Sequence, residues 1–507
     1  MKLFFLFFGT ILIACNLQAA IIHIPADYPT IQEGIDHAHL GDTVLVQPGT
    51  YIETIWLWKP LTLASLYLFT QDTTYISQTI IDGDMQGSGI LIIPFLSGDI
   101  TIQGFTIQHG LGSGPGGEGG GICYPYESSI NDSITLEHLV IRNNQGGGIF
   151  LKKESHDSLT YVLIRDVVLD SNSGDVGGGL YCENLDPILQ NVECKWNYGG
   201  CRGGGCFFEN SNPVLQNVLL FENFACCMCG GDGGGAYFTN SNPVLNNVVV
   251  AGNMWDAMHF YNSSPTLDNV TITNHIYGGI ICDNSHLAIR NSILWDNVQS
   301  GNHQIILHGS DTSSCTISYC DIQDGENGIG IGGNSSLNWL NGNFQYDPLF
   351  LELSDPPFQL SDFSSCIDAG SPDTTGLNLP DGDLLGNQRI WDGNGDGIAI
   401  VDMGAYEYNS VPVGIKNPEH KSQEFEVQSY PNPFSDQVNV EFEVIKPSRV
   451  LIQLMNSLRN ILWTNELGIQ PSGKHTQNLD IRHLASGIYF CKLQVGDQFV
   501  VERLIKL

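Results

Sequence analysis

The chain has 507 residues, 58 of them glycine, and carries 54 acidic side chains against 20 lysines and arginines, for a formal net charge of −34. A chain of this length does not fold around one compact core, so we expect several domains or an elongated repeat structure. The acidic excess argues against binding to nucleic acids or anionic membranes and favours binding of divalent cations.

The N-terminal stretch MKLFFLFFGTILIACNLQAA has one lysine, an apolar run and small residues at its end. This pattern is typical of a secretory signal peptide over residues 1–20, with cleavage near Ala19 or Ala20. The segment LIAC also fits a lipoprotein box, which would tether the protein through Cys15. No other segment is long enough for a transmembrane span, so we expect an extracellular or outer cell-surface protein.

The segment YPTIQEGIDHA predicts a short helix near the start of the mature chain. Thr30 and Glu33 have the spacing of a capping box, and Ile31, Ile35 and Ala38 fall on one helical face. A stack of parallel strands needs a cover at its open end. We expect this helix to cap the N-terminal end of such a stack.

A repeat of apolar, strand-like segments follows the predicted helix. Two asparagine columns mark it, one with members 22 to 30 residues apart. The first column is Asn191, Asn217, Asn247, Asn269 and Asn291, and the second is Asn144, Asn172, Asn197, Asn223, Asn253 and Asn297. Repeats of this size form solenoids, and stacked asparagines can hydrogen-bond from coil to coil as a ladder.

Leucine-rich repeats and parallel β-helices are the two candidate solenoids. A leucine-rich repeat continues from its strand into a helical stretch, whereas this chain continues into glycine triplets such as 203–205 and 233–235. Each glycine costs roughly 1 kcal/mol in a helix, and the residues after each triplet suit a second strand. The pattern therefore favours a parallel β-helix, right-handed because parallel crossovers are right-handed.

The segment IPADYPTIQEGIDHAHLGDTVLVQPGTY, from Ile24 to Tyr51, resembles the first coil of pectin-lyase-like right-handed β-helix proteins, and the repeats continue the likeness to about residue 335. The resemblance implies an all-β fold with a right-handed parallel β-helix over residues 21–340. It does not imply one chemistry, because this fold carries lyases, hydrolases, esterases, adhesins and inert stalks.

Residues 341–408 resemble the segment called the choice-of-anchor Q domain, on the motifs Asp347-Pro348-Leu349-Phe350 and Asp402-Met403-Gly404-Ala405-Tyr406-Glu407. This resemblance implies the end of the helix and a C-terminal cap. Residues 409–427 are polar and rich in turn formers, which is typical of a linker.

Residues 428–507 alternate polar and apolar residues in short runs, which predicts a small β-sandwich of about seven strands. They resemble the C-terminal sorting domain of type IX secretion, on Tyr430-Pro431-Asn432-Pro433-Phe434, Gly487-Ile488-Tyr489-Phe490 and the final Ile505-Lys506-Leu507. Arg459 departs from the glycine usual in one turn of that family. The resemblance implies that the type IX secretion machinery carries the protein across the outer membrane.

The sequence DGNGDG, from Asp392 to Gly397, matches the first half of a calcium-binding loop. We expect a structural calcium ion held by Asp392, Asn394, Asp396 and Asp402, although Met403 stands where such loops carry a bidentate glutamate. The alternative interpretation is an acidic surface turn.

Thirteen of the 14 cysteines lie beyond the leader, and several cluster between Cys194 and Cys229. In an exported protein disulfides between coils are expected rather than a metal centre, because paired C-x-x-C ligand sets are missing. Cys320 and Cys366 are a candidate pair, and Cys201 and Cys226 are further candidates.

A catalytic signature is not recognisable in the sequence. No lysine or arginine lies between Arg202 and Arg290 to serve as the base of a lyase, and nothing groups Asp232, Asp256, Asp268 and Asp283, which we expect to be solvated turn residues. His259 and His275 are expected to be structural. Two carboxylates about 5 to 10 Å apart on one exposed face would instead favour an enzyme.

The aromatic residues after the glycines, such as Tyr181, Phe207 and Tyr237, are expected in the core, whereas Trp196 and Trp255 lie in loops and could stack on sugar rings. We therefore predict a protein that binds a polysaccharide or a cell-surface glycan, and not an enzyme. A polysaccharide lyase or glycoside hydrolase is one alternative, and a structural stalk or adhesin is the other.

Overall fold

The computed structural model describes residues 19–506 apart from several short segments. These segments are 94–95, 115, 127–132, 157–159, 227–231, 298–302, 352–356, 378, 414–426, 432–433, 445–446, 457–460, 483, 485–486 and 496–497. The predicted signal peptide up to residue 18, including Cys15, lies outside the described residues, as do Arg459 and most of the predicted linker. The chain divides into two compact units, Met1–Val413 and Gly414–Leu507.

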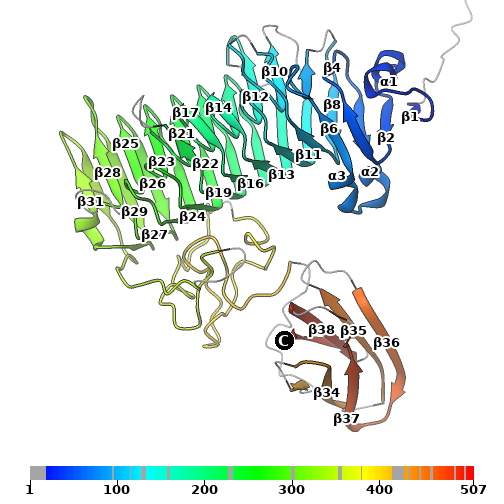
Figure 1. The fold of residues 1–507 in the computed structure, drawn as a ribbon. Coiled ribbons are helices and arrows are strands. Elements are labelled where there is room, and N and C mark those ends of the chain that lie inside the picture. The colour runs from blue at the N-terminus through cyan, green and yellow to red at the C-terminus, as the bar shows by residue number, and fades with distance from the viewer. Residues whose placement is uncertain are drawn as a thin grey trace, which may run out of the picture. The chain divides into compact units, whose positions relative to one another are not determined.

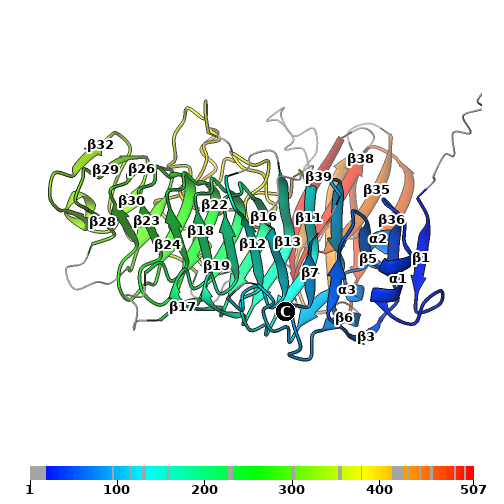
Figure 2. The same ribbon diagram turned by 90° about the horizontal axis from the view of Figure 1, so that it is seen from above.

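The first unit is a right-handed parallel β-helix of about 11 turns, which confirms the predicted fold (Figure 1). Each turn contributes strands to sheet A, with 18 strands, and to sheet B, with 11; three turns add a strand to the small sheet C. Figure 2 shows the stacked coils from above. The coils pair in register, for example Val218 with Val248 and Val248 with Val270.

Sheet A is formed by β1 (Ile21–Ile24), β2 (Thr43–Val46), β3 (Gly49–Ile52), β5 (Thr62–Ser65), β6 (Thr79–Asp82), β8 (Asp99–Gln103), β9 (Thr106–Gln108), β11 (Ser133–Arg142), β13 (Tyr161–Asp170), β16 (Ile188–Lys195), β19 (Val214–Phe221), β22 (Val244–Ala251), β24 (Thr266–Thr273), β26 (His286–Arg290), β27 (Ile293–Trp295), β29 (Ser314–Ser318), β30 (Asp321–Ile322) and β32 (Ser336–Trp339).

Sheet B is formed by β4 (Ile55–Leu57), β7 (Ile90–Ile92), β10 (Ile122–Tyr126), β12 (Ile149–Lys153), β15 (Leu180–Glu183), β18 (Cys206–Glu209), β21 (Ala236–Thr239), β23 (Met258–Tyr261), β25 (Ile280–Asp283), β28 (Ile305–His308) and β31 (Ile329–Ile331). Sheet C is formed by β14 (Ser173–Val176), β17 (Tyr198–Arg202) and β20 (Phe224–Ala225).

The predicted capping helix is α1 (Ile31–His37), in which the Thr30 hydroxyl accepts a hydrogen bond from the Glu33 amide. Ile31 and Ile35 are fully buried and join the interior of the β-helix. Two short helices that the sequence analysis did not foresee, α2 (Tyr67–Thr70) and α3 (Thr74–Gln78), follow β5, and a 3₁₀ turn η2 (Gly325–Gly328) follows β30. Between β10 and β29 the described residues form no helix, which excludes the leucine-rich repeat.

The second asparagine column forms a buried ladder along one corner of the coils. Asn197 Nδ2 donates to Asn223 Oδ1 at 3.0 Å, and Asn223 Nδ2 donates to Asn253 Oδ1 at 2.9 Å. His275 takes the next position, because its ring lies between Asn253, at 3.2 Å, and Asn297, at 2.9 Å. Its role is structural, as expected.

The described residues between 341 and 413 run back along the outer face of sheet A, where Figure 1 shows the yellow segment against the green strands. Ala405 and Tyr406 pack on Leu219 and Val249 there, and Asn269 Nδ2 donates to the Asp402 carbonyl at 2.8 Å. This differs from the expected end coils and cap. The physical reason is that β19 and β22 also carry apolar side chains on their outer face, such as Leu219, Phe221 and Val249, so this face needs a cover.

The second unit consists of two antiparallel sheets, which confirms the predicted β-sandwich. One sheet contains β33 (Val427–Tyr430), β34 (Gln437–Val444) and β37 (Gly473–Asp480), and the other contains β35 (Ser448–Asn456), β36 (Ile461–Gln470), β38 (Gly487–Val495) and β39 (Gln498–Lys506). Val440, Ile452 and Leu493 are among the side chains of its separate buried core.

Candidate functional site

Sheet B presents a column of stacked aromatic rings on its outer face. Because strand side chains alternate, Phe208 and Phe238 point into the interior while Phe207 and Tyr237 point outward. The outward rings of Phe150, Tyr181, Phe207, Tyr237 and His259 stack in sequence, with centroids 4.8, 5.3, 5.4 and 4.9 Å apart. Phe207 and Tyr237 are buried, as expected of core residues, but their rings lie on the outer face of sheet B, where Tyr181 is only half-buried.

The reason lies in the register of the glycine triplets. The residue directly after each triplet, such as Cys206 or Ala236, enters the interior, so the next residue must face outward. Tyr237 is nevertheless only 3% exposed. The rings of Phe207 and His259 stack on it, and the Arg202 guanidinium lies 5.0 Å from the centre of its ring.

A pocket of about 370 Å³ opens on this face, and we call it the sheet B pocket. It is lined by Arg202, Asp232, Tyr237, Thr239, His259, Tyr261 and Asp283. Strands β21, β23 and β25 supply most of these side chains from paired positions, and the corner before β21 supplies Asp232. Residues from four successive coils thus meet at one place.

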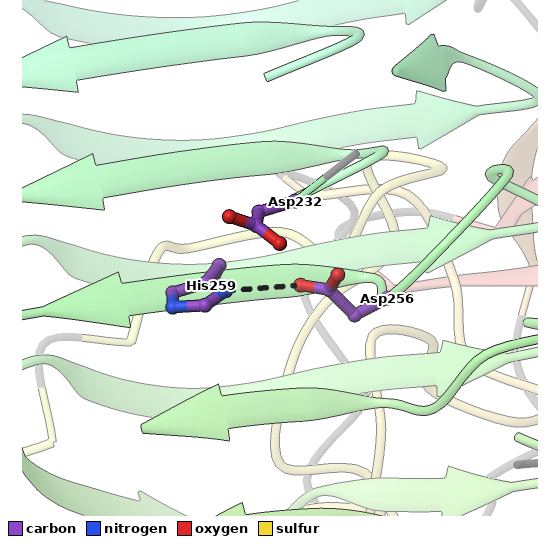
Figure 3. A group of neighbouring side chains, drawn as sticks. All are labelled: Asp232, Asp256 and His259. Atoms are coloured by element: carbon purple, nitrogen blue, oxygen red, sulfur yellow. Dashed lines mark ion pairs between the residues drawn. The ribbon is translucent and has the colours of Figure 1, made fainter. Parts of the chain in front are cut away.

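Two of the side chains at this pocket and the buried Asp256 form a tight group, the carboxylate–histidine cluster, which consists of Asp232, Asp256 and His259 (Figure 3). One ligand atom from each residue lies within 4.8 Å of the others. Asp256 is 3% exposed; its Oδ2 accepts the Gly233 amide at 3.1 Å and lies 3.8 Å from His259 Nδ1. The Asp232 carboxylate faces Arg202 Nε at 3.6 Å.

Burial dominates the electrostatics of the cluster. Burial raises the pKa of Asp256 to about 7, and the charge of Asp232 adds to this rise. Burial also raises the pKa of Asp232, against the opposing effect of Arg202. The pKa of His259 falls to about 3 through burial and the nearby His308 and Arg202. His259 is therefore neutral at pH 7, and its buried Nδ1 has no hydrogen-bond partner.

The cluster overturns the expectation that Asp232, Asp256 and Asp283 are separate solvated turn residues. Asp256 is buried, and Asp232 and Asp283 line one pocket. The sequence held a partial signal for this grouping. Thr239, Tyr261, Asp283 and His308 occupy equivalent positions in successive coils, so their side chains lie on the same face of sheet B. Asp256 had no such signal, since it lies in a corner loop outside the regular strands.

The structure places the two predicted glycan-contact tryptophans apart from the pocket lining. Trp196 is 52% exposed, and its Nε1 donates to Glu222 Oε2 at 2.6 Å. Trp255 directly precedes Asp256 and stacks on Tyr277 with centroids 4.2 Å apart. Sugar contact by either tryptophan stays a prediction.

The predicted calcium loop is an acidic turn held by its own backbone. Asp392 accepts the amides of Gly395, Asp396 and Gly397, and Asn394 accepts the Asp396 amide. Asp402 is buried and accepts the Asp368 and Tyr408 amides at 2.6 Å. Its carboxylate is thus already engaged away from the turn. A structural calcium ion at this loop stays a prediction.

The predicted Cys320–Cys366 disulfide is not formed in the structure, in which both residues are thiols. Cys320 Sγ donates to the Ser318 carbonyl at 3.2 Å, and Cys366 Sγ donates to Asp321 Oδ2 at 3.2 Å. Each buried thiol therefore has a hydrogen-bond acceptor of its own. Cys201 lies in β17 and Cys226 directly follows β20 in the next coil, so the two stand at neighbouring strands of sheet C.

Two segments of the chain match known families. Residues 120–294 match the family described as right-handed β-helix region, and residues 428–507 match the secretion system C-terminal sorting domain. Neither range includes residues 341–408, so the choice-of-anchor Q resemblance stays a prediction. No match is found among curated proteins. The described residues contain no helix that is long and apolar enough to cross a membrane.

Solved structures with β-helices resemble the chain only distantly. A PL6 family alginate lyase, AlyGC, is 14% identical over 68% of this chain and 55% of its own, with a TM-score of 0.33. The tailspike protein gp49 of the Acinetobacter baumannii bacteriophage Fri1, a capsular polysaccharide depolymerase, is 10% identical over 97% of this chain and 78% of its own, with a TM-score of 0.30. The chain spans only about half the length of the lyase, and this likeness carries no conclusion on activity.

Proposed function

We propose that the protein is an exported glycan-binding protein and that the sheet B pocket is its binding site. The lining of the pocket carries the proposal, because the carboxylates of Asp232 and Asp283 stand there beside the ring and hydroxyl group of Tyr261. Carboxylates accept hydrogen bonds from sugar hydroxyls, and aromatic rings cover the apolar faces of sugars. The pocket volume lies within the range of small-ligand sites.

The C-terminal unit supports this proposal from another direction. The sorting domain indicates export by type IX secretion to the cell surface or to the outside. The polymers that a protein meets there are largely polysaccharides. The protein would thus encounter its ligand after passage through the secretion machinery.

The charge of the pocket predicts the class of glycan. Asp232 and Asp283 outnumber the single fixed cation among the lining residues, Arg202. A uronate would meet like charges at short range, which disfavours binding. We therefore expect a neutral polysaccharide and not a polyuronate.

The test is calorimetric titration of the full chain with soluble neutral, amino-sugar and uronate oligosaccharides. We expect binding of a neutral class, weakened by about tenfold or more in Asp283→Asn and Tyr261→Ala. Tyr161→Ala, at an exposed position of sheet A, is the matched control and should bind as the unchanged protein does. Equal affinity in the pocket variants would exclude this site, and no binding to any glycan would favour a structural stalk.

A polysaccharide lyase or glycoside hydrolase at the same pocket is the second candidate. Arg202 and two carboxylates, Asp232 and Asp283, line one pocket, and these are the residue types that the two reactions require. Incubation of the chain with each glycan of the panel should then release new reducing ends from hydrolysis, or unsaturated products from a uronate in a lyase reaction. Arg202→Gln would abolish a lyase reaction, and Asp232→Asn would abolish hydrolysis.

A further inference from the structure

We infer that Asp232, Asp256 and His259 form a binding site for a divalent transition-metal ion at the side of the sheet B pocket. Two carboxylates and one imidazole converge there, with a ligand atom from each within 4.8 Å of the others. Figure 3 shows the three side chains turned toward one common point. The inference does not depend on glycan binding, since it concerns the ion alone.

The histidine supplies the observation that points to a ligand. The His259 side chain is 9% exposed, its Nδ1 is buried, and this atom has no hydrogen-bond partner although it lies 3.8 Å from Asp256 Oδ2. A buried polar atom without a partner costs free energy of about 1 to 3 kcal/mol. A metal ion between Nδ1 and the two carboxylates would satisfy this atom.

The surroundings hold the three ligands in place from separate elements. The His259 ring stacks on Tyr237 at 4.9 Å, the Gly233 amide donates to Asp256 Oδ2, and Asp232 faces Arg202. Such outer contacts fix the orientation of metal ligands. Because Asp232 and His259 also line the pocket, a bound ion would keep a coordination position open toward it.

The mixed ligand set selects the kind of ion. Calcium and magnesium prefer oxygen ligands alone, whereas imidazole together with carboxylates suits manganese, iron, nickel or zinc. The ligand atoms lie 3.8 Å apart between His259 Nδ1 and Asp256 Oδ2, and all three lie within 4.8 Å of one another. A small inward rotation of the side chains would bring each atom to a metal–ligand length of about 2.1 Å. This site is separate from the oxygen-only loop at Asp392.

Manganese is the appropriate probe, because thiols in the chain would compete for zinc. Titration of the full chain with MnCl₂, followed by loss of the free-ion electron paramagnetic resonance signal, counts the bound ions. We expect Asp232→Asn and His259→Phe each to lose one bound ion or to bind it about tenfold or more weakly. His259→Phe keeps a ring for stacking on Tyr237, and melting curves confirm that both variants fold.

The matched control is Asp283→Asn, which changes a carboxylate of the same pocket outside the cluster. It should retain the ion. The inference is overturned if Asp232→Asn and His259→Phe bind the same number of manganese ions with unchanged affinity, or if Asp283→Asn loses the ion equally. Since no sugar is present, the result is independent of the glycan titration.

Discussion

At the residue scale, single polar side chains decide how each coil joins the next. Asn223 is 1% exposed, donates to Asn253 Oδ1 and to the Cys194 carbonyl, and accepts from the amide of Asn197. A column of asparagines can form such bonds from coil to coil, because each side-chain amide both donates and accepts hydrogen bonds. The same logic allows His275 in the column, since its two ring nitrogens can also do both.

Replacement of Asn223 by alanine should therefore destabilise the β-helix by about 2 to 4 kcal/mol, because it leaves several buried groups without partners. Chemical denaturation followed by circular dichroism measures this loss. The control is Gln216→Ala, which removes one half-buried side-chain contact with Gln190 at 3.1 Å. A loss for Asn223→Ala no larger than for this control would contradict a structural role of the ladder.

Asp321 predicts how the stability of the protein depends on pH. Its side chain is buried, Cys366 Sγ donates to Oδ2 at 3.2 Å, and burial raises its pKa to about 7. In the unfolded chain the pKa of this carboxyl is about 4. Between about pH 4 and pH 7 the folded protein therefore keeps the proton on Asp321, whereas the unfolded chain has lost it. The contribution of Asp321 to stability therefore falls as the pH rises from about 4 to 7.

Asp321→Asn, which cannot ionise, should raise the melting temperature relative to the unchanged protein at pH 8, and this gain should shrink at pH 5. The gain in the free energy of unfolding at pH 8 should exceed the gain at pH 5 by about 2 kcal/mol. Melting curves at the two pH values measure it, with the exposed Asp311→Asn as the control. A gain that is equal at both pH values would show that ionisation of Asp321 is not its cause.

At the element scale, close stacking of the coils depends on glycine at the corner before sheet B. A Cβ atom at Gly234 would lie 1.8 Å from the Met254 carbonyl oxygen of the next coil, and at Gly235 it would lie 2.6 Å from the Ala257 carbonyl oxygen. Both neighbours are backbone atoms, so the coils themselves would have to separate. The glycines thus serve close approach as well as turning.

Gly234→Ala should lower the free energy of unfolding by about 3 kcal/mol or more, or prevent folding, because the backbone of the next coil cannot yield locally. Gly332→Ala is the control, since a Cβ atom there meets only ordinary contacts at 3.4 and 3.6 Å. Thermal melting of the two variants compares them. Similar melting temperatures would mean that the coils can move apart at little cost.

At the scale of the whole molecule, the β-helix and the C-terminal unit have separate cores. The apolar clusters of the two units share no residue, and the chain divides between them at Val413 and Gly414. The sorting domain is thus built as an independent module. Folding of the β-helix and its export can be tested separately.

Removal of residues 428–507 should leave the melting transition of the β-helix within about 2 °C of that in the full chain, because its core is intact. The same truncation should retain the protein inside a host that has type IX secretion. Calorimetry and cell fractionation measure the two effects, with the full chain as the control. Export of the truncated chain would contradict the function of the sorting domain.

Sequence alone determined the stacked architecture, because a period of two along each strand and recurring glycine and asparagine columns are local signals. It also identified α1 through the Thr30 cap, and the C-terminal sandwich. Only the tertiary structure grouped Asp232, Asp256 and His259 and placed residues 341–413 on sheet A. The reason is that corner loops vary in length, so neighbours across coils cannot be read from spacing until the register of the coils is known.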